Sequence, residues 1–554
     1  MTRRERNTLL ALWVFLGLLP LLVRPLWEPD EGRYAEIPRE MLATGDWLTP
    51  RLNGVLYFEK PPLQYWLSAL GMRLFGENGA AARLPLALAS GLMIWAAWRL
   101  AKRLGAREPL WAPFMAATGL LAFLVGQILT LDALFSAFLV AGIAAFVEAV
   151  ARRREGAPAR GWTLLAFAFL AGAMLTKGLA ELILTGGILL FSLIFAWKDA
   201  GLRRAVLRTA LDPLGWLLYL ALVVPWFWLV NQANPGHAQF FFIHEHFTRF
   251  LTHEHARQGS DNWLLDKLYF VGILAVGLLP WLSATAVGLG RTWTFLKGRG
   301  PQGADQLARW TVGLAAMALL WPLAFFSLSG SKLPPYILPA VVPLAALACA
   351  FEREGEERVA LRRMGWELMA LGGIFLLAAA VFRKDLGGLA WIFALGAGFI
   401  GLGSWALRPR GLTGPRLMAG LGTALWLLVL AAQAAAGPGK SVADLARKAP
   451  AGAQWISYGT YFQGLPFYAR TRAVVVAGTG ELAYGRDRLP DAGRWFDEDP
   501  AALGAVAERL RSEDPTRPVF VMAKASNWKR LDAGEKARWE EVARNPAAVV
   551  ARRK

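Results

Sequence analysis

The chain has 554 residues, of which 55% are hydrophobic, with a net charge of +19 and one cysteine. A single cysteine excludes a disulfide framework and a thiolate metal site. The positive charge could suggest nucleic-acid binding, but no basic face interleaved with aromatic residues appears, which argues against that class. The mean hydropathy of +0.36 and repeated apolar runs of spanning length instead predict an α-helical integral membrane protein.

Basic residues precede the first apolar run, as in a signal peptide, but no small-residue cleavage site follows it. We therefore expect this run to remain as the first membrane span. Thirteen spans are predicted, at residues 8–26, 82–101, 109–127, 132–150, 161–176, 179–197, 212–231, 267–289, 310–329, 335–351, 364–382, 387–407 and 413–436.

Lysine and arginine gather in alternate connections, beginning with the N-terminus, and the positive-inside rule assigns these connections to the cytoplasm. The outer face then carries two long loops, 27–81 and 232–266, several short turns and the C-terminal segment. From about residue 438 short strands are predicted at 454–458, 472–476 and 518–522, with an amphipathic helix at 501–511. The sequence thus predicts a transmembrane domain over 1–437, whose two long outer loops form the active site, and a small α/β domain over 438–554.

The first outer loop opens with Asp30, Glu31 and Arg33. An acidic pair followed by arginine can supply a general base beside a cation that binds an anion. In a structural interpretation, Asp30 instead caps a helix over 31–41. The two interpretations are compatible, because a cap also fixes the carboxylate in place.

Further along this loop, Tyr57 and Glu59 lead to Lys60, which precedes two prolines. The residue before proline avoids the helical region, so Lys60 is held in an extended conformation. A stiff lysine at the membrane surface suits a lipid-borne phosphate. The alternative is an interfacial lysine that contacts bulk phospholipid headgroups.

All five histidines lie in the second long outer loop. His244 and His246 could form a carboxylate-imidazole metal site with Glu59, although surface histidines without metal are commoner. Arg249 stands between two phenylalanines and is predicted to bind an anion.

Shorter outer turns carry further candidates. Asp132 begins the fourth span, where an acid is either functional or a helix N-cap. Lys177 and Lys332 occupy tight turns in which either could be a snorkelling anchor. Tyr336 adds a phenol that could hydrogen-bond a phosphate.

Four motifs, at 27–34, 58–66, 245–250 and 331–336, resemble those of the membrane-embedded glycosyltransferases of the GT-C superfamily, related to protein mannosyltransferases. Across the whole chain the resemblance is greatest to the aminoarabinose transferases that modify lipid A. It implies an inverting transfer of 4-amino-4-deoxy-L-arabinose from undecaprenyl phosphate to lipid A, on the periplasmic side of the bacterial inner membrane. We expect a monomer in contact with membrane lipids, without a nucleotide cofactor or nucleic acid.

The resemblance also implies roles for individual residues. Asp30 matches the catalytic base, and Glu31 and Asp132 are further catalytic candidates. The residues expected around the donor are Arg33, Lys60, Arg249, Tyr336, Lys332 and Tyr57. Glu59 and a histidine would match a divalent metal site, which could hold zinc in a structural role. His246 is the favoured histidine ligand, and His244 is the alternative.

No sequence motif shows how the amino group of the sugar is recognised, although Glu31, Glu36 or Asp132 could supply a carboxylate for it. Within the enzyme class, the alternative is a transferase that moves a hexose to a protein or another glycan. Outside that class, the alternative is a lipid flippase or transporter. Transporters place charges near the bilayer midplane and often show repeats, whereas this sequence concentrates its charges at one face and shows no repeat.

Overall fold

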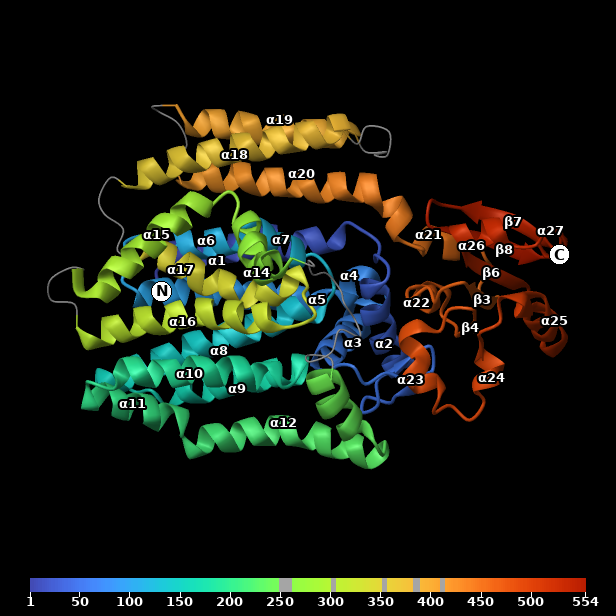
Figure 1. The fold of residues 1–554 in the computed structure, drawn as a ribbon, viewed down its shortest axis with the longest axis horizontal. Coiled ribbons are helices and arrows are strands. Elements are labelled where there is room, and N and C mark those ends of the chain that lie inside the picture. Colours follow the sequence, from blue (N-terminus) through green and yellow to red (C-terminus); the bar gives the residue numbers. More distant parts are fainter. Residues whose placement is uncertain (249–261, 300–304, 351–355, 382–388, 409–413) are drawn as a thin grey trace. The chain divides into compact units, whose positions relative to one another are not determined.

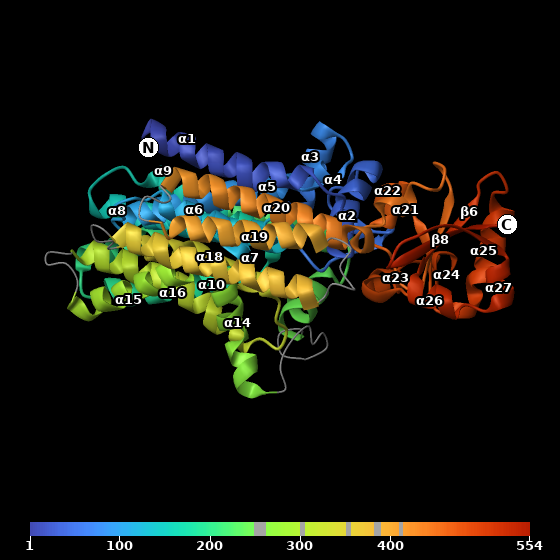
Figure 2. The same ribbon diagram turned by 90° about the horizontal axis from the view of Figure 1, so that it is seen from above.

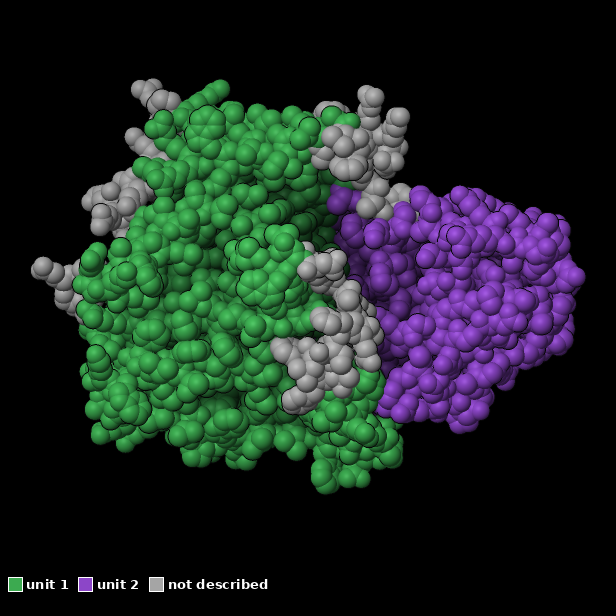
Figure 3. Space-filling model, viewed as in Figure 1, with its two compact units in different colours: residues 1–21, 85–431 green, residues 22–84, 432–554 purple. Residues whose placement is uncertain are grey.

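The computed structural model describes residues 1–248, 262–299, 305–350, 356–381, 389–408 and 414–554 (Figure 1). These residues form two compact units, and each unit combines two separate stretches of the chain (Figure 3). Unit 1 comprises residues 1–21 and 85–431, and unit 2 comprises residues 22–84 and 432–554.

Unit 1 is helical. Its first half contains α1 (Arg3–Leu12), continued by a π-helical and a 3-10 turn to Leu22, then α5 (Leu84–Arg103), α6 (Trp111–Thr118), α7 (Leu120–Val125), α8 (Leu131–Arg154), α9 (Arg160–Lys177), α10 (Ala180–Ala196), α11 (Ala200–Ala210) and α12 (Pro213–Ala233). Its second half contains η3 (Gln239–Thr248), α14 (Trp263–Gly277), α15 (Leu282–Thr294), η4 (Phe295–Arg299), α16 (Gln306–Leu328), η5 (Pro334–Ala340), α17 (Val341–Cys349), α18 (Glu356–Val381), α19 (Leu389–Ala406) and most of α20 (Gly414–Lys440). Helices α8 and α9 pack together, as do α18 and α19 (Figures 1 and 2).

Among the described residues, every predicted span consists largely of helix, so the helical class of the prediction is confirmed. Within the described residues, five helices are long and apolar enough to cross a membrane, or six if one bent pair forms a single span. The five are Arg3–Leu22, Leu84–Arg103, Leu131–Arg154, Ala200–Ala233 and Gln306–Leu328. The chain is thus a multi-pass membrane protein, and the number of thirteen spans stays a prediction.

Two predicted spans are each divided into two helices. The span predicted at 109–127 divides at Gly119 into α6 and α7. The span predicted at 267–289 divides into α14 and α15, which meet at 116°. Pro280 lies in this second break, where a proline cannot donate the backbone hydrogen bond that would continue the helix.

The first predicted outer loop is an ordered part of unit 2. It contains α2 (Asp30–Thr44), the hairpin of β1 (Arg51–Leu52) and β2 (Val55–Leu56), α3 (Leu63–Phe75) and α4 (Gly79–Ala82). The predicted domain boundary at residue 437 is based on membrane topology. By contrast, the compact units of the structure place this loop and the C-terminal segment in the same unit.

The C-terminal segment forms a mixed six-stranded sheet in the order β5-β4-β3-β6-β8-β7. The strands are β3 (Gln454–Tyr458), β4 (Ala473–Val476), β5 (Phe496–Asp497), β6 (Val519–Lys524), β7 (Trp539–Arg544) and β8 (Ala548–Arg553). Strands β3 to β6 are parallel, and β8 is antiparallel to both β6 and β7. The predicted α/β class is confirmed, as are the three predicted strands and the helix, α25 (Leu503–Glu513). The short helices are α21 (Ala443–Ala446), α22 (Leu465–Ala469), η6 (Gly480–Leu482), α23 (Ala483–Arg486), α24 (Ala492–Trp495), η7 (Pro500–Ala502), α26 (Ala525–Arg530) and α27 (Ala533–Ala537).

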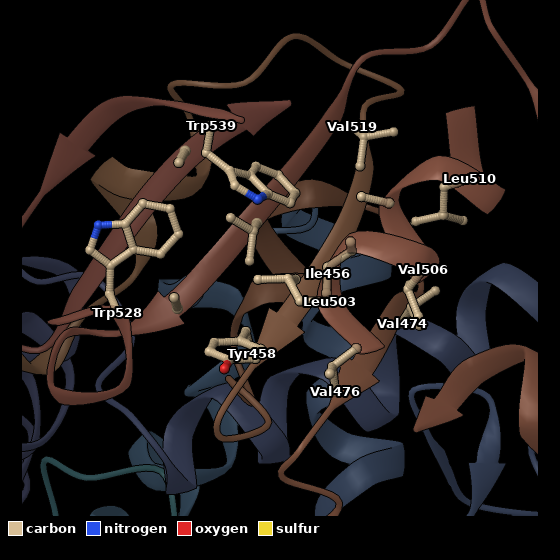
Figure 4. Close-up of a cluster of buried hydrophobic side chains, with 14 of the residues drawn as sticks. Ile456, Tyr458, Val474, Val476, Leu503, Val506, Leu510, Val519, Trp528 and Trp539 are labelled. Carbon is tan, nitrogen blue, oxygen red and sulfur yellow. The ribbon is translucent and has the colours of Figure 1, made fainter. Parts of the chain in front are cut away.

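Side chains alternate between the two faces of the sheet along each strand. Both faces are covered by hydrophobic clusters. On one face Ile456 and Val521 pack with Leu503 of α25 and with Trp528 and Trp539 (Figure 4). The other face packs against α21 and α22 through a second cluster, which includes Trp455, Phe520, Met522, Leu445 and Leu465.

Candidate active site

Asp30 is the first residue of α2 and comes directly after the first predicted span. The N-cap position belongs to Pro29 and no side chain caps this helix, so the capping interpretation of Asp30 is wrong. Instead, Oδ1 of Asp30 accepts a hydrogen bond from Nη2 of Arg33, one turn along the helix. The Asp30 side chain is 46% exposed. A carboxylate that is anchored through one oxygen and still reaches solvent is suited to accept a proton.

Arg33 is buried and connects α2 to two other segments of unit 2. Its Nη1 donates to the Tyr57 hydroxyl at 3.2 Å and to Oε2 of Glu481. Burial by itself would lower the pKa of Arg33, but its neighbours, Tyr57 and Asp30 among them, raise that pKa well above its ordinary value. Arg33 is therefore a permanent cation, and we call Asp30, Arg33, Tyr57 and Glu481 the Arg33 cluster.

Glu481 belongs to η6 and reaches Arg33 because its segment packs on the β1-β2 hairpin. The ring of Tyr484 meets that of Phe58 edge-on, with centroids 6.1 Å apart. Gly485 approaches the hairpin so closely that a Cβ there would lie 2.4 Å from the Leu56 carbonyl oxygen. The sequence interpretation missed Glu481, since 448 residues separate it from Arg33 and its neighbour Gly480 looks like an ordinary turn residue.

A second close approach involves Gly32, the residue before Arg33. A Cβ on Gly32 would lie 2.4 Å from the backbone nitrogen of Gly464, so glycine is required for the two backbones to meet. The Gly464 N–H donates to Oε1 of Glu28 at 2.7 Å. Burial raises the pKa of Glu28 to about 8, against backbone hydrogen bonds and Arg33, which lower it. Glu28 is consequently protonated near neutral pH.

Glu31 has a different environment from Asp30. It is completely buried between Arg24 and Arg83, which donate to its Oε1 at 2.9 and 2.8 Å. Its Oε2 accepts from Arg83 and from the backbone N–H of Trp27, both at 2.9 Å. Burial raises and the two arginines lower the pKa of Glu31, to about 2. This saturated carboxylate favours a structural role over the predicted catalytic role.

Glu59 and Lys60 follow the hairpin and are both half-buried. The Lys60 ammonium donates to the Glu59 carbonyl oxygen at 2.7 Å. The Glu59 carboxylate contributes to the raised pKa of Arg33, which places it near the Arg33 cluster. The structure therefore gathers five of the predicted residues, Asp30, Arg33, Tyr57, Glu59 and Lys60, in one part of unit 2.

Unit 1 holds a second group of candidate residues. Asp132 lies in the first turn of α8, whose N-cap is Thr130, so the capping interpretation is wrong here too. The Asp132 carboxylate pairs with the ammonium of Lys177 at the end of α9. That ammonium also lies 4.3 Å from the ring centroid of Tyr336. Lys177 thus joins two predicted site residues.

Lys332 is only 2% exposed, which contradicts the snorkelling interpretation for this lysine. Its ammonium donates to Oδ2 of Asp266 at 3.0 Å and to the Ser329 carbonyl oxygen at 2.6 Å. Asp266 also lies 3.4 Å from the ammonium of Lys267. Lys332 is held in place by these partners, and its predicted contact with the donor stays a prediction.

The histidine loop is described only in part. His244 is exposed in η3, stacks on Phe240 with centroids 5.3 Å apart, and lies 3.8 Å from Glu245. The side chain of His246 and the whole of Arg249 lie outside the described residues. His237, which was not singled out, is buried, and burial lowers its pKa to about 4.

No group of three or more His, Cys, Asp or Glu side chains is arranged to hold a metal ion in the described part of the chain. Glu59 belongs to unit 2 and His244 to unit 1. The metal site predicted from Glu59, His246 and His244 therefore stays a prediction.

Comparison with known proteins decides the family. A family model described as dolichyl-phosphate-mannose-protein mannosyltransferase matches residues 59–228. An undecaprenyl phosphate-alpha-4-amino-4-deoxy-L-arabinose arabinosyl transferase of Pseudomonas aeruginosa is 32% identical over 534 residues, which cover 93% of this chain and 85% of that protein. The chain belongs to this arabinosyl transferase family. Its counterpart in Edwardsiella ictaluri is 35% identical over 411 residues, covering 72% of this chain and 70% of the relative.

Solved structures support the same family. Crystal structures of ArnT from Cupriavidus metallidurans match with TM-scores of 0.77 for the apo state and 0.75 for the complex with undecaprenyl phosphate. Both are 26% identical to this chain and cover 99% of it and 97% of ArnT. The resemblance to polyprenyl-phosphate glycosyltransferases inferred from the four motifs is thus confirmed. As a member of the arabinosyl transferase family, the chain is a glycosyltransferase.

Proposed function

We propose that this chain moves 4-amino-4-deoxy-L-arabinose from undecaprenyl phosphate to lipid A, with inversion at the anomeric carbon. The proposal places the reaction on the periplasmic face of the bacterial inner membrane, with the N-terminus in the cytoplasm and the C-terminal domain in the periplasm, and takes the protein to be a monomer. Similarity to arabinosyl transferases over nearly the whole chain supports the substrate. The observation that carries the chemistry is the exposed Asp30 carboxylate anchored on buried Arg33.

In the proposed reaction, Asp30 is the general base. The nucleophilic oxygen of the acceptor attacks the anomeric carbon and gives its proton to Asp30, while the bond from that carbon to the carrier phosphate breaks. The bonding electron pair leaves with the phosphate. The hydrogen bond from Arg33 orients the Asp30 carboxylate, and a positioned carboxylate within reach of the acceptor is what a general base requires.

The leaving phosphate needs nearby positive charge to stabilise the transition state. Arg33 and Lys60 supply it in unit 2, and the hydroxyl of Tyr57 beside Arg33 is a further donor. Arg249, Lys332 and Tyr336 remain predicted ligands of the same phosphate. Since arginine and lysine can balance the phosphate charge, the proposed transfer includes no step through a metal, and a structural zinc bound by Glu59 stays a separate proposal.

We further propose that Glu481 recognises the sugar amino group, in place of the carboxylates expected from the sequence. Glu31 is saturated by arginines, and both oxygens of buried Glu36 accept from Arg39 at 2.6 Å. Glu481 is 27% exposed and lies on the same arginine as Asp30. An ammonium that reached the Arg33 cluster would find a carboxylate there with the opposite charge.

The variant Glu481→Gln tests this assignment. A charged hydrogen bond contributes about 1.5–3 kcal/mol, so KM for the aminoarabinose donor should rise about tenfold or more. A polyprenyl-phosphate pentose without the amino group should be used equally by both proteins. Glu498→Gln is the matched control, since Glu498 is exposed in the same domain. Equal losses with both donors would show that Glu481 only supports Arg33.

Mass spectrometry of lipid A tests the function as a whole. Cells that express this chain should gain lipid A species heavier by one aminopentose, and cells with Asp30→Asn should not. The purified protein in vesicles with the donor and lipid A should form the same product. A hexose added to protein or to another glycan, with lipid A unchanged, would contradict the proposed donor and acceptor and favour the related hexose transferase.

A further inference from the structure

Unit 1 contains an open basin of about 530 Å³ at the ends of α8, α9 and α11, far in sequence from the proposed catalytic residues. It is lined by five arginines, Arg153, Arg154, Arg160, Arg204 and Arg208, and otherwise by glycines and alanines. We call this the arginine basin. Its volume lies within the range of small-molecule sites in proteins.

The arginine basin has an excess of positive charge. Arg153 donates to Oδ2 of Asp212 at 3.2 Å, and Arg154 donates to Oδ2 of Asp199 at 3.1 Å. Arg160 lies 3.9 Å from the Asp212 carboxylate that Arg153 already binds. These two carboxylates leave the five arginines with three uncompensated charges among the described residues.

Arg204 and Arg208 are exposed and stand one turn apart on α11, so their like charges repel each other. Within the described part of the chain, neither forms an ion pair. The opposite side of α11 is buried through Leu202, Val206 and Thr209. This helix therefore packs one face on unit 1 and keeps two arginines together on another.

The surroundings of the arginine basin match a membrane interface. Trp197 follows α10 and is 66% exposed, while Trp216 begins α12 and is 40% exposed. Tryptophan is enriched at the level of lipid headgroups. Leu207 and Leu211 add exposed apolar side chains beside the basin. The predicted topology assigns the connections that contain these arginines to the cytoplasmic side, where positive charge meets anionic lipid.

We propose that the arginine basin binds the phosphate diester headgroup of an anionic phospholipid at the predicted cytoplasmic face of the membrane. Arginine guanidinium groups match phosphate with paired N–H donors, so a headgroup phosphate between Arg204 and Arg208 relieves their repulsion. The exposed leucines and tryptophans beside the basin accommodate the acyl chains. This site is independent of the proposed transferase function.

The test uses the full-length protein in nanodiscs or detergent, with phosphatidylglycerol and phosphatidylcholine as probes. Native mass spectrometry should show preferential retention of phosphatidylglycerol. The double variant Arg204→Gln/Arg208→Gln should lower its affinity by about tenfold or more, since each arginine near anionic lipid contributes a factor of about five. The double variant Arg3→Gln/Arg6→Gln is the matched control, because these exposed arginines lie on the same predicted face but outside the basin.

Equal losses in both double variants would overturn the proposal in favour of bulk charge, and no loss in the basin variant would overturn it outright. Glycerophosphoglycerol, the same headgroup without acyl chains, is the second probe. If it binds as tightly as the intact lipid, the basin is a site for a soluble anion and the lipid assignment is wrong. Should the glutamine variant fail to fold, Arg204→Lys/Arg208→Lys keeps the charge and removes the paired N–H donors, and undiminished lipid retention in that variant would contradict the proposed geometry.

Discussion

Two neighbouring carboxylates at the start of α2 have opposite environments. Glu31 is fully buried and accepts four or more hydrogen bonds from Arg24, Arg83 and the Trp27 backbone. Asp30 is nearly half exposed and is anchored through a single arginine. Similar charged groups thus form a closed network at one residue and an open site at the next. The difference teaches that the number of unused acceptor positions, rather than the presence of acids and arginines, separates a saturated structural carboxylate from one that is open to a substrate.

The largest expected effect comes from removing the open carboxylate. Asp30→Asn keeps the size of the side chain and removes its basicity, so the transfer rate should fall by about 10²- to 10⁴-fold. Thermal unfolding and membrane insertion should change little, since buried Arg33 keeps its ion pair with Glu481 in this variant. A rate assay in vesicles measures the loss, and near-normal turnover would end the assignment of Asp30 as base.

Removing the buried Glu31 carboxylate should lower stability, in contrast to the loss of activity expected for Asp30→Asn. Glu31→Gln leaves Arg24 and Arg83 buried without their anion, which costs about 3–5 kcal/mol of folding free energy. The variant should show a lowered unfolding midpoint and a reduced yield in the membrane. A Glu31→Gln protein of normal stability but without activity would instead support the predicted catalytic role of Glu31.

Lys60 tests how far the open site extends. Lys60→Ala removes one cation from the proposed donor site, and the affinity for undecaprenyl phosphate should weaken by about tenfold. Arg51→Ala is a suitable control, because Arg51 lies in the same loop and is more than one third exposed. Direct binding measurements with the carrier lipid give the comparison. Unchanged donor affinity in the Lys60 variant would favour a contact with bulk headgroups.

A further expected effect concerns the dependence of stability on pH at Glu28. The pKa of Glu28 is about 8 in the folded protein against 4.5 for an ordinary glutamate, so between these values only the folded form keeps the proton. Stability contributed by this group is complete below pH 4.5, declines as pH rises and is lost above pH 8. Glu28→Gln retains the oxygen that accepts from Gly464 and should show a smaller fall in melting temperature from pH 5 to pH 8. A slope equal to that of the unmodified protein would contradict the raised pKa.

The sequence predicts the helices well, because a spanning length of apolar residues is a local property. It predicts β3 and β6 for the same reason, since both are short apolar runs between turns. It misses β7, whose exposed Glu540 and Glu541 give no strand-like alternation of apolar residues. It also misses the bend near Pro280. A hydropathy profile measures the length of an apolar run and does not detect a missing backbone hydrogen bond within it.

The candidate site was only partly predictable. The local motifs identify Asp30, Arg33 and Lys60, which the structure places in one unit. The partners of these residues, above all Glu481, come from distant segments that no spacing rule connects. The caps predicted for Asp30 and Asp132 are wrong because each carboxylate pairs with a cation instead of the helix backbone. Ion pairing of this kind depends on tertiary contacts.

The assembly of unit 2 from both ends of the chain affects the order of its biogenesis. Leu26 donates its backbone N–H to the Tyr468 hydroxyl, and Asn53 exchanges two hydrogen bonds with the backbone of Ala473. At ordinary rates of synthesis, these partners leave the ribosome on the order of tens of seconds apart. The nascent α2 must therefore wait until the C-terminal segment has been synthesised, and a transferase shortened at its C-terminus would never complete the surroundings of Asp30.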